Sequence, residues 1–143
     1  THIGGGVPRR VEWVVDETLR LWPSGFIGRR ATRDVDLAGW QVPARTEVMV
    51  ALRALHLLAP GLVEPTEFRP GRWENARLER GGYVPFGGGA HRCFGARLGH
   101  AQMCAALVEI LRRCRLTLVG EAAPANALSV LRPAECGLRV TPR

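Results

Sequence analysis

A glycine-rich stretch that leads one cysteine to the start of a long helix constrains this chain most. Gly87, Gly88 and Gly89 precede Cys93, and glycine lets a backbone approach a neighbouring group closely. Apolar residues then recur at helical spacing, at Phe94, Leu98, Ala101, Ala105, Val108 and Leu111. This spacing predicts a helix over residues 95–114, whose beginning would stabilise a thiolate as a nucleophile or soft metal ligand. An inert packing cysteine fits the local chemistry equally well.

The residues around Cys93 resemble the haem-binding loop of the cytochromes P450, the haem-thiolate monooxygenases. That loop runs Phe, Gly, any residue, Gly, any residue, a basic residue or His, any residue, Cys, an apolar residue and Gly. Every constrained position is met, by Phe86, Gly87, Gly89, His91, Cys93, Phe94 and Gly95. The resemblance implies that these residues bind haem b and that Cys93 is the catalytic axial thiolate on the iron, where it favours O–O cleavage. It also implies that His91 contacts a haem propionate.

Two further motifs carry the same resemblance. Glu17 and Arg20 match the family's Glu-x-x-Arg, and residues 68–73 match its Phe-x-Pro-x-Arg-Trp segment, with Gly71 in place of the usual Glu. The resemblance implies a buried structural triad of Glu17, Arg20 and Arg72 that holds the cysteine loop. The alternative is an exposed ion pair on one helix face, worth about 0.3–0.5 kcal/mol.

Residues for the haem propionates and the substrate follow from the same alignment. Arg29 aligns with a propionate-binding arginine on a strand; Arg30 is the rival one position out of register, and a solvated strand end is the alternative for both. The substrate-lining positions fall on Ser24, Gly25, Phe26, Ile27 and, near the C-terminus, Ser129. These residues are small or apolar, which suits a lipophilic substrate, although plain packing explains them as well.

The periodicity along the chain predicts a mixed α and β fold that is mainly helical. Helices are expected over residues 11–22 and 52–58, a hairpin around Gly39, a strand through Val48 and Val50, and short strands over residues 116–119, 128–131 and 138–140. Arg45 replaces a turn glycine and would be strained if the turn needs a positive φ. The resemblance makes residues 1–143 the C-terminal portion of a cytochrome P450 domain whose N-terminal part is absent.

The implied function is insertion of one oxygen atom from O2 into a lipophilic substrate, and the fragment alone is expected to be inactive. A ferredoxin or a flavodoxin-like protein is the expected electron donor. The face of this chain on which the donor docks would carry five arginines: Arg92, Arg97, Arg112, Arg113 and Arg115. The alternative is that these arginines only form a solvated helix end. His91 and the composition predict a soluble, bacterial-type, cytoplasmic enzyme, while a membrane anchor stays open.

Composition leaves two other classes to weigh. The net charge is +7 and all 20 basic residues are arginine, which would suit a nucleic-acid partner. The arginines are scattered and aromatic residues make up only 6%, so we expect no nucleic acid. A small zinc module could use His91, Cys93, His100 and Cys104, but their spacing matches no zinc-finger pattern. Cys104, Cys114 and Cys136 are expected to be free packing thiols.

Overall fold

The computed structural model describes residues 7–75, 81–120, 125–127, 131–133 and 137–143. Within them the helices are α1 (Arg9–Leu21), α2 (Leu52–Leu57) and α3 (Ala96–Arg113), with 3-10 turns η1 (Pro70–Glu74) and η2 (Gly89–His91). The strands are β1 (Phe26–Arg30), β2 (Val35–Leu37), β3 (Trp40–Val42), β4 (Glu47–Ala51), β5 (Cys114–Val119), β6 (Ala125–Ala127), β7 (Leu131–Pro133) and β8 (Gly137–Pro142). They pair as four two-stranded antiparallel sheets. The mixed, mainly helical fold class is therefore confirmed.

Helix α1 forms where it was predicted, but its buried face is not the expected one. Pro8 precedes it with a φ of −60°, which suits a helix start, and Trp22 ends it. Val15 and Leu21 are buried as the spacing predicts, whereas Thr18 and Trp22, placed on the same apolar stripe, are exposed. Glu17 and Arg20 are fully buried in their place. The apolar spacing was misleading here because the segment packed against α1 supplies polar partners.

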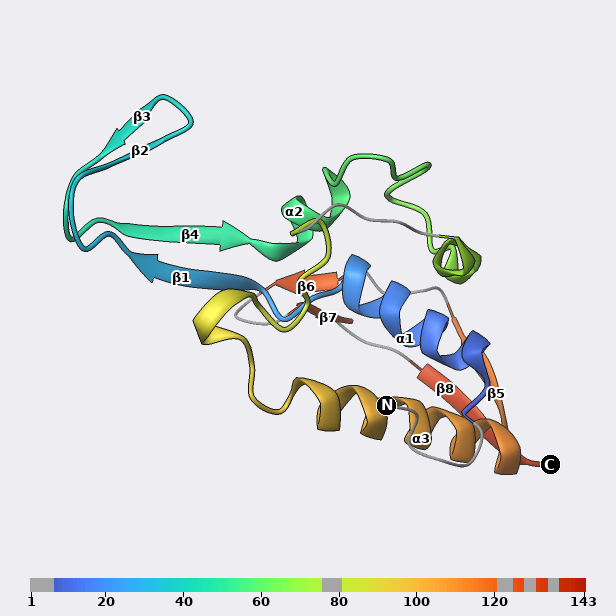
Figure 1. The fold of residues 1–143 in the computed structure, drawn as a ribbon. Helices are drawn as coiled ribbons and strands as arrows, with labels where there is room; N and C mark the ends of the chain where they lie inside the picture. Colours follow the sequence, from blue (N-terminus) through green and yellow to red (C-terminus); the bar gives the residue numbers. More distant parts are fainter. Residues whose placement is uncertain (1–6, 76–80, 121–124, 128–130, 134–136) are drawn as a thin grey trace.

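Strands β1 and β4 form a ribbon that carries the β2–β3 hairpin at its far end, away from the helices (Figure 1). The hairpin turn consists of Ala38 and Gly39, with φ values of 51° and 90°. Two positive φ values match the right-handed twist of paired strands, so the predicted hairpin around Gly39 is confirmed with its physical cause. The predicted strand through Val48 and Val50 is β4, and the predicted helix over 52–58 is α2.

Arg45 adopts the left-handed conformation, which is the condition under which the sequence predicted strain at this position. Its φ is 72°, and the turn is closed by the Thr46 N–H, which donates to the Pro43 carbonyl at 3.2 Å. A positive φ at the third position of such a turn favours glycine, because a Cβ is crowded by the backbone there. Arg45 therefore carries local backbone strain.

Replacing Arg45 with glycine is expected to stabilise the protein by about 0.5 kcal/mol, because the relieved left-handed strain slightly exceeds the added chain entropy of glycine. Urea unfolding of the full-length protein measures the change. Ala44→Gly is the matched control one residue earlier, where φ is not positive, and it should lower stability by about 0.5–1 kcal/mol. Equal losses for both variants would contradict the strain at Arg45.

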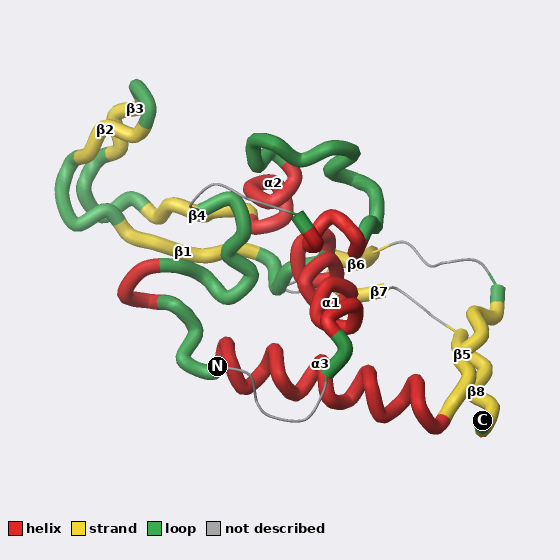
Figure 2. The backbone as a smooth tube through the Cα atoms, turned by 45° about the vertical axis from the view of Figure 1, so that its right-hand side comes forward, coloured by secondary structure: helices red, strands yellow, loops and turns green. Residues whose placement is uncertain are grey.

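Helix α3 begins beside the glycine-rich loop, as predicted, but its two buried residues lie outside the predicted apolar stripe. Phe94 and Leu98 are exposed, Leu98 at 64%, while Ala96 and Cys104 are buried. Ala96, His100 and Cys104 follow one another at four-residue steps, so they share the face that lies against α1. Figures 1 and 2 show α1 next to α3, and α3 ending at the β5–β8 pair.

The C-terminal strands are antiparallel pairs of neighbours in space. Leu116 of β5 pairs with Val140 of β8, so the strands predicted over 116–119 and 138–140 are confirmed. The strand predicted over 128–131 falls between β6 and β7: residues 128–130, including Ser129, lie outside the described residues, and Leu131 begins β7.

Candidate functional site

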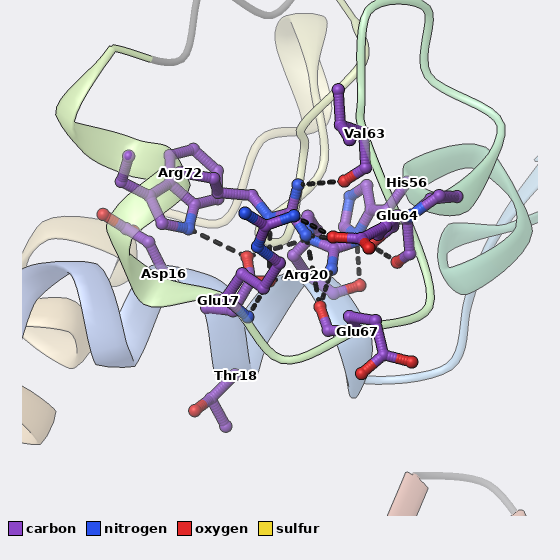
Figure 3. Close-up of polar contacts among 12 residues, drawn as sticks. Asp16, Glu17, Thr18, Arg20, His56, Val63, Glu64, Glu67 and Arg72 are labelled. Atoms are coloured by element: carbon purple, nitrogen blue, oxygen red, sulfur yellow. Dashed lines mark hydrogen bonds and ion pairs between the residues drawn. The ribbon is translucent and has the colours of Figure 1, made fainter.

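The centre of the described structure is a buried carboxylate. Glu17, fully buried, accepts five hydrogen bonds (Figure 3). Its Oε1 accepts from Arg20 Nη2, from the Arg69 backbone N–H and from Arg72 Nε, each at 2.9 Å. Its Oε2 accepts from Arg20 Nε at 2.9 Å and from Trp73 Nε1 at 3.0 Å. One carboxylate thereby joins α1 to the η1 segment.

The two guanidiniums use their remaining donors on backbone carbonyls. Arg20 donates to Pro65 O at 2.6 Å and to Glu67 O at 3.2 Å. Arg72, whose side chain is 9% exposed, donates to Val63 O at 2.8 Å and also to the carbonyls of Glu64 and Glu67. This arrangement needs a planar fork of N–H groups, which arginine has and lysine lacks. The structure thus brings Glu17, Arg20 and Arg72 together, away from solvent.

Charge compensation decides the protonation of Glu17. Burial by itself would raise the pKa of this carboxyl, but hydrogen bonds from Arg20, the Arg69 N–H and Arg72 outweigh it and hold the pKa below its usual value. Glu17 is therefore an anion between two cations, and an exposed ion pair, the alternative weighed for this motif, does not describe it.

A second set of contacts connects this cluster to the chain that enters the cysteine loop. Trp73 lies against Tyr83, with ring centroids 4.6 Å apart, and the Tyr83 hydroxyl donates to Asp16 Oδ1 at 3.0 Å. Burial is the main cause that raises the pKa of Tyr83 well above its usual value, and the neighbouring Asp16 carboxylate adds to it. The Tyr83 hydroxyl therefore remains protonated and is a donor. The Val84 backbone N–H donates a hydrogen bond to His56 Nε2 at 3.0 Å. The sequence patterns gave no signal for these contacts.

The loop of Cys93 is closed by its own backbone. The Cys93 N–H donates to Phe86 O at 2.9 Å, and the Gly87 N–H donates to Val84 O at 2.9 Å. Gly87 and Gly89 have φ values of 76° and 68°, which a residue with a Cβ adopts only at a cost, so glycine is required there. Cys93 lies three residues before the first residue of α3 and is an exposed, free thiol.

The residues on either side of Cys93, Arg92 and Phe94, are exposed. A Cβ at Gly89 or Gly95 would meet nothing within 4 Å, and the side chain of Phe94 is fully exposed. On the other side a Cβ at Gly87 would meet Ile27 Cδ1 at 3.7 Å, so β1 reaches the loop. An accessible thiol with an exposed aromatic side chain next to it in the chain would suit a haem iron as its thiolate ligand.

Arg29 and Arg30, the two candidates for binding a haem propionate, lie on opposite faces of strand β1. Ile27 and Arg29 are two residues apart and lie on one face of the strand, the face that Ile27 turns toward the loop. Arg30 lies on the opposite face and pairs with Glu47 at 2.6 Å. This geometry favours Arg29, whose guanidinium donates a single side-chain hydrogen bond within the described residues, to Gly28 O at 2.8 Å.

The other predicted positions are at or near the surface. His91 is exposed in η2, Ser24 is exposed, Gly25 has a φ of 88°, and Phe26 is 52% exposed. Their roles toward haem or substrate stay predictions. The five arginines of the predicted docking face, Arg92, Arg97, Arg112, Arg113 and Arg115, are also exposed.

The zinc alternative does not have the necessary geometry. His100 Nε2 lies 3.1 Å from Asp16 Oδ1, and His100 Nδ1 lies 3.7 Å from Cys104 Sγ, so this pair is engaged with α1. Over the described ranges, no group of three or more His, Cys, Asp or Glu side chains could hold a metal ion. Burial, with Glu12 and Asp16 nearby, raises the pKa of the Cys104 thiol. Cys104 and Cys114 are free, and Cys136 lies outside the described residues.

Comparison with known proteins decides the family. A sequence model described as Cytochrome P450 matches residues 10–135. This chain belongs to the cytochrome P450 family. It is 35% identical over 125 residues to (1S)-1-hydroxy-luvungin A synthase CYP88A37 of Citrus sinensis, and 33% identical over 123 residues to beta-amyrin 11-oxidase of Glycyrrhiza uralensis. The crystal structure of a cytochrome P450, CYP102L1, superposes with a TM-score of 0.85 and 32% identity over 94% of this chain.

These matches cover only part of the P450 proteins concerned. The two curated relatives are matched over 85% of this chain but 25% of their own length, and CYP102L1 over 32% of its length. The chain therefore spans about a quarter of the curated relatives that it matches.

The expectation of a bacterial-type, soluble, cytoplasmic protein is wrong. Relatives matched over 85–92% of this chain come from the plants Citrus sinensis, Glycyrrhiza uralensis and Oryza sativa. The expectation rested on His91 and on the composition. Among the described residues, no helix is both long enough and apolar enough to cross a membrane.

Proposed function

We propose that this chain is the haem-thiolate portion of a cytochrome P450 monooxygenase, with residues 1–143 forming part of one P450 domain. The observation that carries the proposal is the exposed, free Cys93 on a glycine-rich loop that is closed by its own backbone and abuts β1. When bound, haem b would supply the chemistry of O2 activation and oxygen insertion.

The residues of the chain have distinct parts in this proposal. Cys93 Sγ would bind the iron as a thiolate, held at a constant position because its N–H is bonded to Phe86 O. Arg29 and His91 would bind the propionates, since both side chains suit carboxylates. Gly87 and Gly89 would keep Cβ atoms away from the cofactor, and Phe94 would cover it with apolar surface.

The substrate and the electron donor enter at other places in the same proposal. Ser24, Gly25, Phe26 and Ile27, with Ser129, would line a pocket for a lipophilic substrate. An acidic ferredoxin or flavodoxin-like donor would dock against the exposed arginines of the loop and α3. The 143-residue chain alone is proposed to be inactive, because it spans only about a quarter of its curated relatives.

Cys93→Ala is expected to abolish the red-shifted Soret band of a thiolate-ligated haem. The measurement is the absorption spectrum of the full-length protein, reduced and treated with carbon monoxide. Cys114→Ala is the matched control, since Cys114 is also a free thiol but lies at the other end of α3, and it should keep the band. A thiolate-type band that persists in Cys93→Ala, or wild-type protein that binds no haem, would refute the proposal. Extraction of the haem into acidified organic solvent would identify it as haem b.

A further inference from the structure

We infer that His56 is a positioning residue for the Cys93 loop, whose imidazole links the backbone of α1 to the backbone that enters the loop. The inference rests on the proposed function of Cys93 as the iron ligand. It concerns a residue outside the Glu17–Arg20–Arg72 triad, and it assigns His56 a part that the triad cannot perform, because none of the hydrogen bonds of those three side chains reaches residues 83–93.

The bonds of His56 define its proton positions. The side chain is fully buried in α2; its Nδ1 lies 3.1 Å from Arg20 O, and its Nε2 lies 3.0 Å from the Val84 backbone N. A carbonyl only accepts and a backbone N–H only donates, so Nδ1 must carry the proton and Nε2 must be unprotonated. His56 is therefore a neutral ring of one defined tautomer that satisfies a buried backbone group on each side.

The two hydrogen bonds of His56 form a bridge from Arg20 O to the Val84 N–H, and Val84 is the residue through which this bridge positions the loop. Its carbonyl accepts from the Gly87 N–H at 2.9 Å, and Phe86, between them, accepts from the Cys93 N–H at 2.9 Å. Its Cγ1 would lie 3.9 Å from a Cβ at Gly88, so the Val84 side chain also borders the glycines. A shift of Val84 would therefore be transmitted through two short turns to the backbone of Cys93.

At its other end, His56 is bonded to Arg20, a fully buried residue with several hydrogen bonds. Arg20, whose carbonyl accepts from His56, has its guanidinium on Glu17 and on two further carbonyls. Tyr83 adds a contact from the side, with its ring centroid 5.4 Å from that of His56. Because His56 connects the restrained Arg20 to Val84, it fixes the position of the backbone at the start of the loop.

Two variants separate the two halves of the bridge. The amide of His56→Gln extends about as far as Nε2 and can still accept from the Val84 N–H, whereas the shorter amide of His56→Asn reaches only as far as Nδ1. Leu52→Ala, in the same helix and also buried, is a control that loosens packing without touching Val84. All are made in the full-length protein, with hydrogen exchange of a peptide containing Val84 and the carbon monoxide spectrum as readouts.

We expect the Val84 amide to exchange about tenfold faster in His56→Asn, the effect of losing one hydrogen bond of about 1.4 kcal/mol. The same variant should lose part of its thiolate-type band. His56→Gln should restore both readouts, and Leu52→Ala should lower the melting temperature without selective loss at Val84. Ring nitrogen shifts of labelled histidine should show Nδ1 protonated in the wild type.

Three results would overturn the inference: an unchanged Val84 exchange rate in His56→Asn, an equal acceleration in Leu52→Ala, or faster exchange with an unaltered spectrum. Wild-type protein without haem would refute the proposed function alone. In that case the exchange of Val84 and the tautomer of His56 still test the bridge itself.

Discussion

Glu17→Ala is expected to lower the free energy of unfolding by about 3–5 kcal/mol, the cost of breaking a buried ion pair from one side. The substitution leaves the guanidinium of Arg20 fully buried and that of Arg72 nearly so, each without its counter-ion, and removes the acceptor of the Arg69 N–H and of Trp73 Nε1. Since a domain has only about 5–15 kcal/mol of stability, much of the protein should be unfolded or aggregated. Urea unfolding and the yield of soluble full-length protein measure the loss.

Glu47→Ala is the matched control for this experiment. Glu47 also pairs with an arginine, Arg30, at 2.6 Å, but their side chains are 73% and 66% exposed. Such a pair contributes about 0–1 kcal/mol, so the control should be close to wild type. Comparable losses for Glu17→Ala and Glu47→Ala would mean that burial does not set the strength of the Glu17 cluster.

Arg20→Lys is the second substitution with a large expected effect, although it retains the charge. Lysine cannot reproduce the fork that binds both oxygens of Glu17 together with Pro65 O and Glu67 O. At least one buried acceptor is left unpaired, which costs about 1–3 kcal/mol for each group. We expect a loss of about 2–4 kcal/mol in the same unfolding measurement.

Arg30→Lys provides the comparison on the surface. Its only carboxylate partner in the described residues is Glu47, and an ammonium group can make that single exposed contact, so the change should stay below about 0.5 kcal/mol. If Arg20→Lys were equally mild, the fork geometry at Glu17 would not be what stabilises the cluster.

Local elements were predictable wherever neighbouring residues decide the conformation. The turn of Ala38 and Gly39, the strained Arg45 and the helix that follows Cys93 all depend on local spacing and on the φ values that a residue tolerates. The packing faces were less predictable. The stripe through Leu98 is exposed and Glu17 is buried, because burial depends on which segment lies opposite.

The candidate site divides in the same way. Cys93 and its glycines could be found from a motif, since a loop that approaches a cofactor closely needs residues of those types at that spacing. The contacts of His56, Tyr83 and Asp16 could not be found in this way. These contacts join residues 27 to 67 positions apart, for which a single sequence contains no signal.

By itself, the sequence determined the family resemblance, the loop that presents Cys93 and the local turns, because these follow from residue type and short spacing. Only the tertiary structure decided that Glu17 binds Arg20, Arg72 and Trp73 out of water. It also decided that Arg29 shares the loop-facing side of β1 and that His56 connects α1 to Val84. The physical reason is that the strength of a charge or hydrogen bond depends on its burial and partners, which only the folded chain establishes.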